Sequence, residues 1–519
     1  MSHVKADWIQ RHLRSADGQQ ISDLSEPVRV RMALTELGTT FIKLGQILST
    51  RADLVGPEWA KELTELQSST PPDTAAEVVQ TITEEFGSPP DALFSRFDAQ
   101  AFASASIGQV HRATLLDGTD VVVKVQHRGI ENRVRNDVEI LVELAKLAET
   151  YSPEMAQYNP VATAKEFRDT LLDELDFTRE QRSLLRFTAN FSDDVGIRFP
   201  TPHLDRCSKR VLTMDALDGT SVANRAQLET AGHDLTDLAR RGAEMFLKMV
   251  FRDGFYHADP HPGNLMVLAD EVIGVLDCGM VGRVDEDLRE QIEDLLLAAI
   301  DKDADRLLDT LTGLGQLPPD FERTRLRSNL IEFIGEHGAQ SIDQFDLSGG
   351  LNEMMAIIRD HHILLPSRVS LLIKMLVMLE GTSKQLNPAF SIVELLEPYR
   401  VETIKRRLSP QRMWRKLQGM HRDWSRLAES LPGDVSDIVN RIRRGRFDVY
   451  LEHRRLDSIV NRLVMGLLVS ALFLGSASMI SNGVQPLIRE TSLPGAFGCA
   501  LAVGLGAMLI AAIKKSGNI

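Results

Sequence analysis

The segment HADPHPGNLMV, residues 257–267, places oxygen-bearing side chains in a loop that prolines interrupt. Asp259 and Asn264 lie five positions apart, and Asp277 follows two short apolar runs, LMVL and VIGVL, which we expect to pair as a β-hairpin. Carboxylate and amide oxygens are ligands that Mg²⁺ prefers beside phosphate oxygens. We therefore expect Asn264 and Asp277 to hold metal, while Asp259 orients or deprotonates an attacking hydroxyl group. Taken alone, the spacing also fits a turn with Asx caps.

A candidate cation lies upstream, in the apolar run VVVKV. Lys124 is expected on a strand that follows SASIG, a connection of small residues. A cation beneath such a loop suits the α- and β-phosphates of a nucleotide, and it needs a carboxylate to fix its position. The helical segment LLDELDFTREQR offers candidates. A strand lysine is also typical of a solvated sheet edge, so the ordered combination with the downstream loop is what favours a nucleotide site.

The segment FIKLGQ contains a further polar pair. Lys43 and Gln46 are spaced to lie one helical turn apart on one face, so both could reach a single polar pocket. The alternative is a solvated helix face. If the pair instead covers an active site, it occupies the room that a protein substrate's peptide would need.

The elements that position these residues follow from periodicity. Residues 101–126 predict two antiparallel strands joined by a type I′ turn at Asp117-Gly118, and residues 210–219 predict a further strand. Apolar residues at three- and four-residue spacing predict helices elsewhere. These are two helices in 29–70, then helical stretches at 131–150, 161–190 and 234–253, and an almost wholly helical region from 284 to about 400.

Two long uncharged runs lie near the C-terminus, Leu463 to Ile488 and Leu493 to Ile513. Each is long enough to cross about 30 Å of hydrocarbon as a helix, although two buried core helices are the alternative. Flanking basic residues put both ends on the cytoplasmic side: Arg454, Arg455, Arg462, Lys514 and Lys515. The recurrence of Gly498, Ala502 and Gly506 every four residues predicts close packing of the two helices.

Composition limits the alternatives. A chain of 519 residues with 43% hydrophobic residues is expected to form two or three folded domains. Its formal net charge of −14 argues against a general nucleic-acid binder. Its three widely separated cysteines suggest neither a disulfide framework nor a zinc site, and its charged N-terminus lacks the apolar core of a secretory signal.

The motifs, taken in order, resemble those of the protein-kinase-like fold. More narrowly, the chain is similar to the UbiB family of atypical kinases, which is associated with ubiquinone biosynthesis and lipid homeostasis. The matching segments are FIKLGQ, ASASIGQVH in place of a glycine-rich loop, ELDFTRE, HADPHPGN and LDCG. The resemblance runs from about residue 25 to residue 400. It implies an α+β, protein-kinase-like two-lobed fold with an N-terminal helical K-x-G-Q extension and a C-terminal transmembrane helical hairpin.

The resemblance also implies a role for each matching residue. Lys124 would bind phosphate with Glu180 as its ion-pair partner, Asp259 would be the catalytic-loop aspartate, and Asn264 and Asp277 would be metal ligands. The expected nucleotide contacts are Ala103, Ser104, Ala105 and Ser106 in the small-residue loop, and Asp215 at the end of the linker strand. The K-x-G-Q and E-x-D motifs, expected to meet over the active site, are Lys43, Gly45, Gln46, Glu174 and Asp176. Here Cys278 replaces the middle Phe of D-F-G, and serines alternate with alanines in the nucleotide loop.

The same motifs divide the chain into five expected parts. They are the helical K-x-G-Q extension (1–100), a kinase-like N-lobe with a helical insert (101–219), a kinase-like C-lobe (220–400), a basic helical juxtamembrane segment (401–462) and two transmembrane helices (463–513). Basic clusters at 403–416 and 441–455 could bind anionic lipid headgroups or be solvated helix faces. A multi-pass protein of the bacterial inner membrane, with its kinase-like part in the cytoplasm, is expected.

The expected function is that of a membrane-anchored enzyme with ATP and Mg²⁺ as cofactors. It would hydrolyse ATP or phosphorylate a lipid or quinone-precursor-like small molecule in support of isoprenoid quinone biosynthesis. The expected partners are membrane lipids, anionic ones included, and quinone-biosynthesis enzymes, with no nucleic acid. Two alternatives stay open: a nucleotide-sensing membrane scaffold with little turnover, and a true protein kinase.

Overall fold

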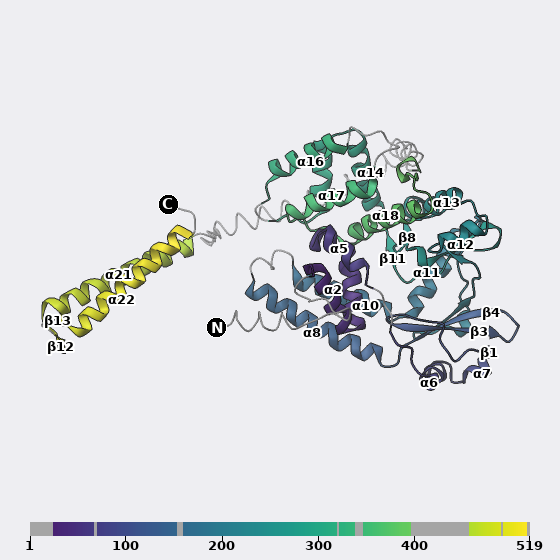
Figure 1. The fold of residues 1–519 in the computed structure, drawn as a ribbon, viewed down its shortest axis with the longest axis horizontal. Coiled ribbons are helices and arrows are strands. Elements are labelled where there is room, and N and C mark those ends of the chain that lie inside the picture. The colour runs from purple at the N-terminus through teal and green to yellow at the C-terminus, as the bar shows by residue number, and fades with distance from the viewer. Residues whose placement is uncertain are drawn as a thin grey trace, which may run out of the picture. The chain divides into compact units, whose positions relative to one another are not determined.

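The computed structural model describes residues 24–66, 70–152, 159–318, 321–337, 346–395, 456–488 and 491–515. They belong to two compact units, one within Met1–Arg412 and one within Met413–Ile519. The first unit is a mixed α+β fold with mostly helices, and the second is a helical hairpin (Figure 1). The basic clusters at 403–416 and 441–455 lie outside the described residues, as do Arg454 and Arg455.

Among the described residues between 24 and 66, the first unit contains four helices where the periodicity predicted two. They are α2 (Glu26–Leu37), α3 (Thr39–Leu48), α4 (Ala52–Val55) and α5 (Pro57–Thr64). Two glycines with positive φ angles make the difference: Gly38 at 95° ends α2, and Gly56 at 92° ends α4. A side chain is strained in that conformation, so glycine permits the chain to turn there. Helices α2, α3 and α5 and the residue Leu66 that follows them share a small core of Leu34, Ile42, Leu63 and Leu66.

A five-stranded antiparallel sheet follows. It is formed by β1 (Phe94–Phe97), β2 (Ala103–Ser104), β3 (Gly108–Leu115), β4 (Asp120–Gln126) and β6 (Val211–Asp215), with β1-β3-β4-β6 as the main order and β2 paired to β3. On β4, Val121, Val123 and Val125 are buried against α6 (Ala75–Phe86). Because side chains alternate along a strand, Lys124 points to the opposite face of the sheet.

The β3–β4 hairpin is confirmed, but the predicted turn type is wrong. Leu115 accepts a hydrogen bond from the Gly118 amide and donates one to the Thr119 carbonyl, which leaves three residues in the loop. Gly118 alone has a positive φ, at 92°. These contacts define a type I turn followed by a bulge at glycine, and the Asp117 carboxylate accepts a hydrogen bond from the Thr119 amide. Asp117 therefore caps the turn without adopting the left-handed conformation that a type I′ turn requires.

The described residues between β4 and β6 include three long α-helices. The predicted helix at 131–150 is α8 (Ile130–Tyr151), and the stretch at 161–190 is divided into α10 (Pro160–Glu174) and α11 (Phe177–Asn190). The division occurs because Asp176 is extended and its carboxylate accepts the amide of Thr178, which starts a new helix. The motif E-x-D thus spans a helix junction, and Glu174 and Glu180 lie on different helices.

The second half of this unit contains short strands and long helices. A four-stranded sheet, in the order β5-β10-β9-β7, consists of β5 (Ile197–Arg198), β7 (Thr220–Ser221), β9 (Leu265–Val267) and β10 (Ile273–Val275). A separate antiparallel pair joins β8 (Phe255–His257) to β11 (Val281–Arg283). The α-helices that the structure describes here are α12 (Arg225–Thr230), α13 (Leu235–Leu247), which continues as a π-helix over Lys248–Asp253, α14 (Glu286–Ile300), α15 (Ala304–Leu314), α16 (Arg323–His337), α17 (Leu347–Asp360) and α18 (Ser367–Leu386). The predicted hairpin between LMVL and VIGVL is confirmed as β9 and β10.

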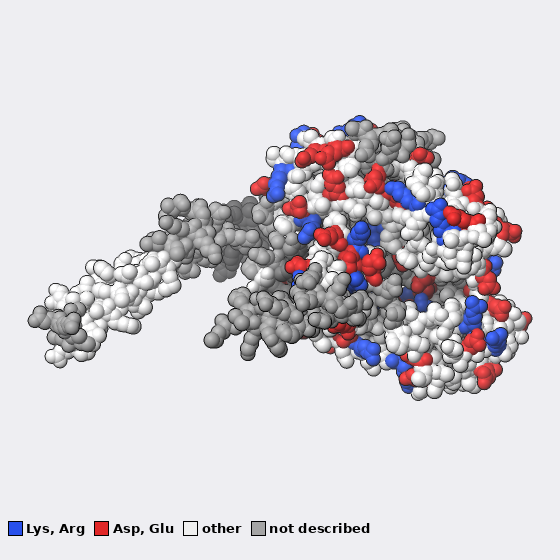
Figure 2. Space-filling view, viewed as in Figure 1, with Lys and Arg blue, Asp and Glu red and all other residues white. Residues whose placement is uncertain are grey.

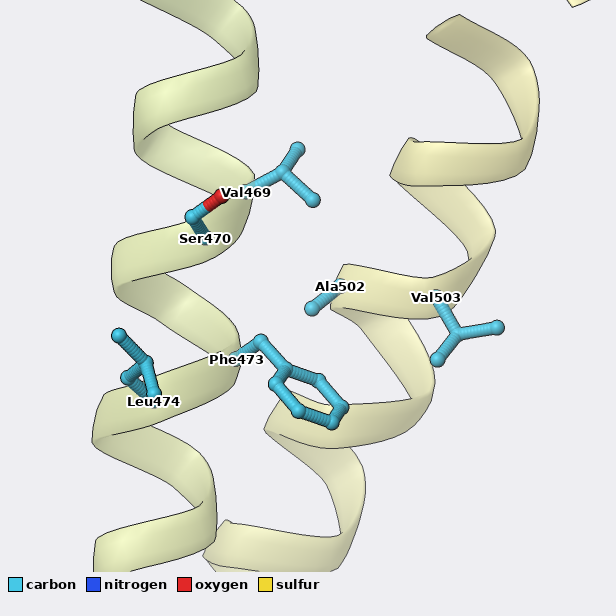
Figure 3. Close-up of a pocket in the computed structure, with 6 residues that line it drawn as sticks. All are labelled: Val469, Ser470, Phe473, Leu474, Ala502 and Val503. Carbon is cyan, nitrogen blue, oxygen red and sulfur yellow. The ribbon is translucent and has the colours of Figure 1, made fainter. Parts of the chain in front are cut away.

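The second unit consists of α21 (Leu456–Ser481) and α22 (Leu493–Lys515), joined by the short paired strands β12 (Leu487–Ile488) and β13 (Thr491–Ser492). The stripe of small residues faces α21, as predicted: Ala502 is 2% exposed, and a Cβ on Gly498 would overlap the Ser476 side chain. An open cleft of about 450 Å³ lies between the helices, lined by Val469, Ser470, Phe473, Leu474, Ala502 and Val503 (Figure 3). Ala502 points across it toward α21.

Within the described residues, one helical stretch is long and apolar enough to cross a membrane, Val464–Ser481 of α21, of which only 6% is buried. A shorter apolar stretch, Leu493–Met508, belongs to α22. Neither stretch contains a charged residue, whereas acidic and basic side chains intermingle over the visible face of the first unit (Figure 2). One long apolar helix is thus observed, and the second membrane span stays a prediction.

Candidate functional site

Lys124 joins three distant segments of the chain. Its ammonium lies 2.8 Å from a carboxylate oxygen of Glu180 on α11, and 3.8 Å from one of Asp277, two residues after β10. Its ammonium also lies 5.3 Å from the centre of the Phe177 ring, which can contribute a cation–π attraction. The predicted cation, its helix partner and the carboxylate of LDCG therefore meet on the face of the sheet opposite α6.

The three charges set one another's ionisation. Burial opposes the charge of Lys124, but Asp277 and Glu180 outweigh it and raise the Lys124 pKa. Lys124 in turn holds the pKa of Asp277 well below its usual range, helped by the Gly279 amide, which donates to that carboxylate at 2.8 Å. Burial raises the pKa of Glu180 above its usual range even though Lys124 lies beside it. Asp277 is consequently the group's anion at neutral pH, and its side chain is 52% exposed.

The K-x-G-Q segment lies on α3 and reaches the same region. The ammonium of Lys43 forms an ion pair of 2.8 Å with Glu174, the last residue of α10. Burial opposes the charge of Lys43, but Glu174 and then Asp277 raise its pKa. Gln46 donates its amide to the Leu66 carbonyl at 2.9 Å. A Cβ on Gly45 would overlap the Leu66 side chain, which explains a glycine between the two polar residues.

Asp259 and Asn264 are connected inside the loop that follows β8. The Asn264 side-chain amide donates to the Asp259 carboxylate at 2.9 Å and to its carbonyl at 3.2 Å. The β9–β10 register opposes Leu265 to Val275, and the Leu276 amide donates to the Asn264 carbonyl at 2.9 Å. This register brings Asn264 beside the residue that precedes Asp277, as the predicted hairpin requires.

His257 links the two ends of this arrangement. The side chain is buried, its Nδ1 accepts the Asp259 amide at 3.1 Å, and its Nε2 lies within hydrogen-bond distance of the Asp277 carbonyl. The first contact makes Nδ1 an acceptor, so Nε2 carries the proton and donates it. The first residue of H-x-D thus fixes the backbone of Asp259 relative to that of Asp277, a role that sequence spacing alone did not assign.

These donors fit a Mg²⁺ ion, which binds few protein ligands and completes its shell with water and phosphate oxygens. Both amide hydrogen bonds of Asn264 point toward Asp259, so its side-chain oxygen is the atom that could bind a metal ion. One oxygen of Glu180 is buried with no hydrogen-bond partner among the described residues, so the site has unused acceptor capacity. The described residues contain no cluster of three or more His, Cys, Asp or Glu suited to a metal ion.

His127 contacts the small-residue loop through its side chain. Its Nε2 lies 3.1 Å from the Ala105 carbonyl and 3.5 Å from the Ser104 hydroxyl, while its Nδ1 lies 2.9 Å from Asp73. Ser106 is buried, and Ala103 and Ser104 form β2. The sequence provided no signal for His127.

Two predicted residues have local partners instead of contacts at the Lys124 cluster. Asp215 ends β6 opposite Val121, three positions along β4 from Lys124, and its carboxylate lies 3.0 Å from His203. Asp176 caps α11 through Thr178. Their expected nucleotide and motif roles stay predictions.

One further residue beside the site, Lys374, was missed. Lys374, on α18, donates to the Ser49 hydroxyl at 3.1 Å, and its pKa is lowered chiefly by burial, while Asp259 opposes and Lys43 adds to that effect. A lysine within a long helix carries no motif, so nothing in the sequence distinguished it from a solvated side chain. Cys278 is fully buried, and its pKa is raised well above the ordinary value by burial.

Three regions of the chain match known protein families. Residues 65–311 match the ABC1 atypical kinase-like domain, residues 331–391 the UbiB helical domain and residues 452–515 the ABC1/UbiB kinase-like C-terminal domain. A protein named "Probable protein kinase UbiB" from Aeromonas salmonicida is 31% identical over 427 residues, covering 81% of this chain and 78% of the relative. The chain belongs to the UbiB family. Its kinase-like fold and the predicted family are therefore confirmed.

Other relatives of this UbiB family member are similarly distant. A "Probable protein kinase UbiB" of Azotobacter vinelandii is 33% identical, with 80% of this chain and 78% of that one covered. A Clostridium pasteurianum protein, described only as an uncharacterized protein in the hydrogenase 1 5′ region, is 29% identical over 97% of this chain and 96% of that one. The solved complex of Rv3197 with erythromycin from Mycobacterium tuberculosis aligns with a TM-score of 0.46 at 23% identity, covering 70% of this chain and 93% of that one.

Proposed function

We propose that this protein is a membrane-anchored, Mg²⁺-dependent atypical kinase or ATPase that acts in isoprenoid quinone biosynthesis or lipid homeostasis. The observation that carries the proposal is the meeting of Lys124, Glu180 and Asp277 beside the loop that holds Asp259 and Asn264. Family membership supports phosphoryl transfer as the chemistry. The link to quinone metabolism rests on the family resemblance.

The chemistry would consist mainly of positioning and charge neutralisation. Lys124, kept charged by its two carboxylates, would bind the α- and β-phosphates of ATP. Asp259 would accept a hydrogen bond from the attacking hydroxyl group and take its proton as the new bond forms. Mg²⁺, held by the Asp277 carboxylate and the Asn264 side-chain oxygen, would neutralise phosphate charge. Glu180 would fix the position of Lys124.

The acceptor is proposed to be small. Lys43 lies near enough to Asp277 for its pKa to respond to that carboxylate, and its ion pair with Glu174 ties α3 to α10 beside the site. An extended polypeptide substrate would need the space beside the site that Lys43 and Glu174 occupy, whereas water or the hydroxyl group of a lipid-related molecule would not. The Lys43–Glu174 ion pair therefore favours ATP hydrolysis or lipid phosphorylation over the protein-kinase alternative.

Membrane anchoring is proposed for the second unit. The stretch Val464–Ser481 is apolar and uncharged, and only 6% of it is buried, which is unfavourable in water but suits hydrocarbon. The test is flotation of the whole chain with neutral and anionic vesicles at two salt concentrations. Anchoring by α21 predicts binding to both kinds of vesicle at high salt, with anionic lipid adding a salt-sensitive component through the basic residues. Failure to float with either vesicle would contradict it.

The enzyme proposal is tested by phosphate release from ATP by the whole chain in liposomes. Replacing Asp277→Asn should lower the Mg²⁺-dependent rate by about 10²-fold or more, because it removes the charged metal ligand. Asp270→Asn is a matched control at the tip of the same β9–β10 hairpin. Asp270 is exposed with φ 56°, a conformation that Asn tolerates.

The other outcomes identify the alternatives. Tight binding of nucleotide without metal-dependent turnover would favour the alternative of a membrane scaffold that changes its conformation when it binds ATP. Transfer of labelled phosphate to an added polypeptide would favour a true protein kinase. Turnover that is the same in the intact chain and in Asp277→Asn would contradict the proposed site.

A further inference from the structure

Lys374 is a third cation beside the predicted active site, contributed by the helical part of the first unit. Its helix, α18, is hydrogen-bonded on one side of this residue to the catalytic loop and on the other side to β8, the strand that precedes the loop. The Thr382 hydroxyl donates to the Pro260 carbonyl at 2.9 Å, and the Tyr256 hydroxyl donates to the Arg368 carbonyl at 3.3 Å. Arg368 and Thr382 are about 21 Å apart along the helix at 1.5 Å per residue, and Lys374 lies between them. The helix is thus fixed alongside the residues that flank Asp259.

The three lysines differ in what neutralises them. Lys124 faces Glu180 and Asp277, and Lys43 is paired with Glu174. Within the part of the chain that the structure describes, no carboxylate lies within ion-pair distance of Lys374, whose ammonium donates to the neutral Ser49 hydroxyl. Burial lowers the pKa of Lys374, and Asp259 is the carboxylate that acts on it. A half-buried ammonium without an anion is stabilised when one arrives.

The catalytic loop itself provides no lysine or arginine that could act as this cation. Between Asp259 and Asn264 the residues are Pro260, His261, Pro262 and Gly263, with no Lys or Arg among them. Phosphoryl transfer spreads negative charge over the oxygens of the transferred group, and a cation provided from another element of the same chain can stabilise that charge strongly. Lys374 is such a cation on the Asp259 side, as Lys124 is on the Asp277 side.

We propose that Lys374 binds the γ-phosphoryl group of ATP during transfer, exchanging its bond to the Ser49 hydroxyl for one to a phosphate oxygen. This inference rests on the proposed function. In the step, the oxygen of the accepting hydroxyl group forms a bond to the γ-phosphorus, and the bond from that phosphorus to the β–γ bridging oxygen breaks. ADP leaves with the electron pair of that bond, and the proton of the accepting hydroxyl passes to Asp259. Lys374 remains an ammonium throughout and donates to the transferring group.

The inference predicts a specific kinetic signature. In the whole chain in liposomes, Lys374→Met should lower kcat for Mg²⁺·ATP by about 10²-fold, with a change in KM of less than about threefold, because the contact strengthens in the transition state. Lys374→Arg keeps the charge and should restore kcat to within about tenfold of the intact chain. Lys146→Met, at an exposed lysine of α8, is the matched control and should behave like the intact chain.

A second readout separates a role in transfer from a structural one. ADP with Mg²⁺ and aluminium fluoride mimics the transferring phosphoryl group, whereas a non-hydrolysable ATP analogue mimics the ground state. Lys374→Met should weaken binding of the first by at least about tenfold and leave binding of the second nearly unchanged. Equal weakening of both, or kcat as in the intact chain, would overturn the inference while leaving the proposed function intact. No turnover by the intact chain would overturn the proposed function, and this inference with it.

Discussion

The ammonium of Lys124 and the carboxylate of Glu180 meet at 2.8 Å although the residues are 56 positions apart in the chain. The contact ties the sheet to α11, and Glu180 is only 5% exposed. A buried carboxylate without its cation is costly. The ion pair therefore has a structural consequence as well as a proposed catalytic one.

The first prediction concerns this pair. Lys124→Met should lower the free energy of unfolding by about 3 kcal/mol because it leaves Glu180 buried and unpaired. The double variant Lys124→Met/Glu180→Leu should recover much of that loss, since it removes both charges, yet neither variant should bind ATP normally. Urea denaturation in detergent and nucleotide titration measure the two properties. Equal stability of the single and double variants would contradict the predicted coupling.

The second prediction is a pH dependence. The pKa of Asp277 is lowered in the folded protein, chiefly by Lys124, so its contribution to stability is present above the unfolded pKa of about 3.9 and is lost as pH falls toward the lower folded value. Asp277→Asn should therefore lose less stability between about pH 5 and pH 3 than the intact chain does. Because Asp277 is half exposed, solvent screening keeps this difference modest. Denaturation midpoints at each pH measure it, and parallel curves would contradict the assignment.

The third prediction tests the packing of the K-x-G-Q helix. Gly45→Val should destabilise the first unit by about 1–3 kcal/mol, because a larger side chain would collide with Leu66 and Leu34. It should also reduce ATP turnover, since α3 carries Lys43. Gly313→Ala is the contrasting control: a Cβ on this exposed helical glycine would meet nothing within 4 Å, and alanine there should stabilise by up to about 1 kcal/mol. Thermal unfolding compares the two.

A fourth prediction concerns the second unit. Gly498→Ile should lower the thermal stability of the hairpin in detergent, because its side chain would collide with Ser476 on α21. Gly504→Ile should have little effect, since nothing lies within 4 Å of a Cβ at that position. Similar melting of both variants would show that the two helices do not pack through the small-residue stripe.

The cysteines give a fifth prediction. Cys278 is fully buried, and Cys207, half-buried with its thiol donating to the Thr213 carbonyl at 3.4 Å, has its pKa raised to about 11 by burial. Since the thiolate is the reactive form, both should resist iodoacetamide at pH 8 in the folded protein and react on unfolding. Mass spectrometry of labelled peptides measures this. Fast modification of folded Cys278 would contradict its burial.

Much of the site was predictable because its signals are local. The LMVL and VIGVL runs determine the β9–β10 hairpin, and that register alone brings Asn264 beside Leu276. Alternating valines on β4 predict the face on which Lys124 lies. The turn at Gly118 was predicted less well, because dipeptide composition does not distinguish a two-residue loop from a three-residue loop with a bulge.

Other features depend on tertiary contacts that no local pattern encodes. The break between α10 and α11 follows from Asp176 capping a new helix, where periodicity alone continued through 161–190. Lys374 and His127 act through partners that are 325 and 54 positions away in the chain, Ser49 and Asp73. A single sequence shows such residues only as an ordinary helix lysine and an ordinary loop histidine.

The most direct test of one shared nucleotide site is labelling with an acyl-phosphate derivative of ATP, which acylates lysines close to the bound phosphates. The site predicts that Lys124 is modified, that Lys43 or Lys374 is modified with it, and that excess Mg²⁺·ATP prevents both, while exposed Lys146 is insensitive to ATP. Modification of Lys124 that ATP does not prevent, or ATP-protected labelling confined to lysines elsewhere in the chain, would contradict the shared site.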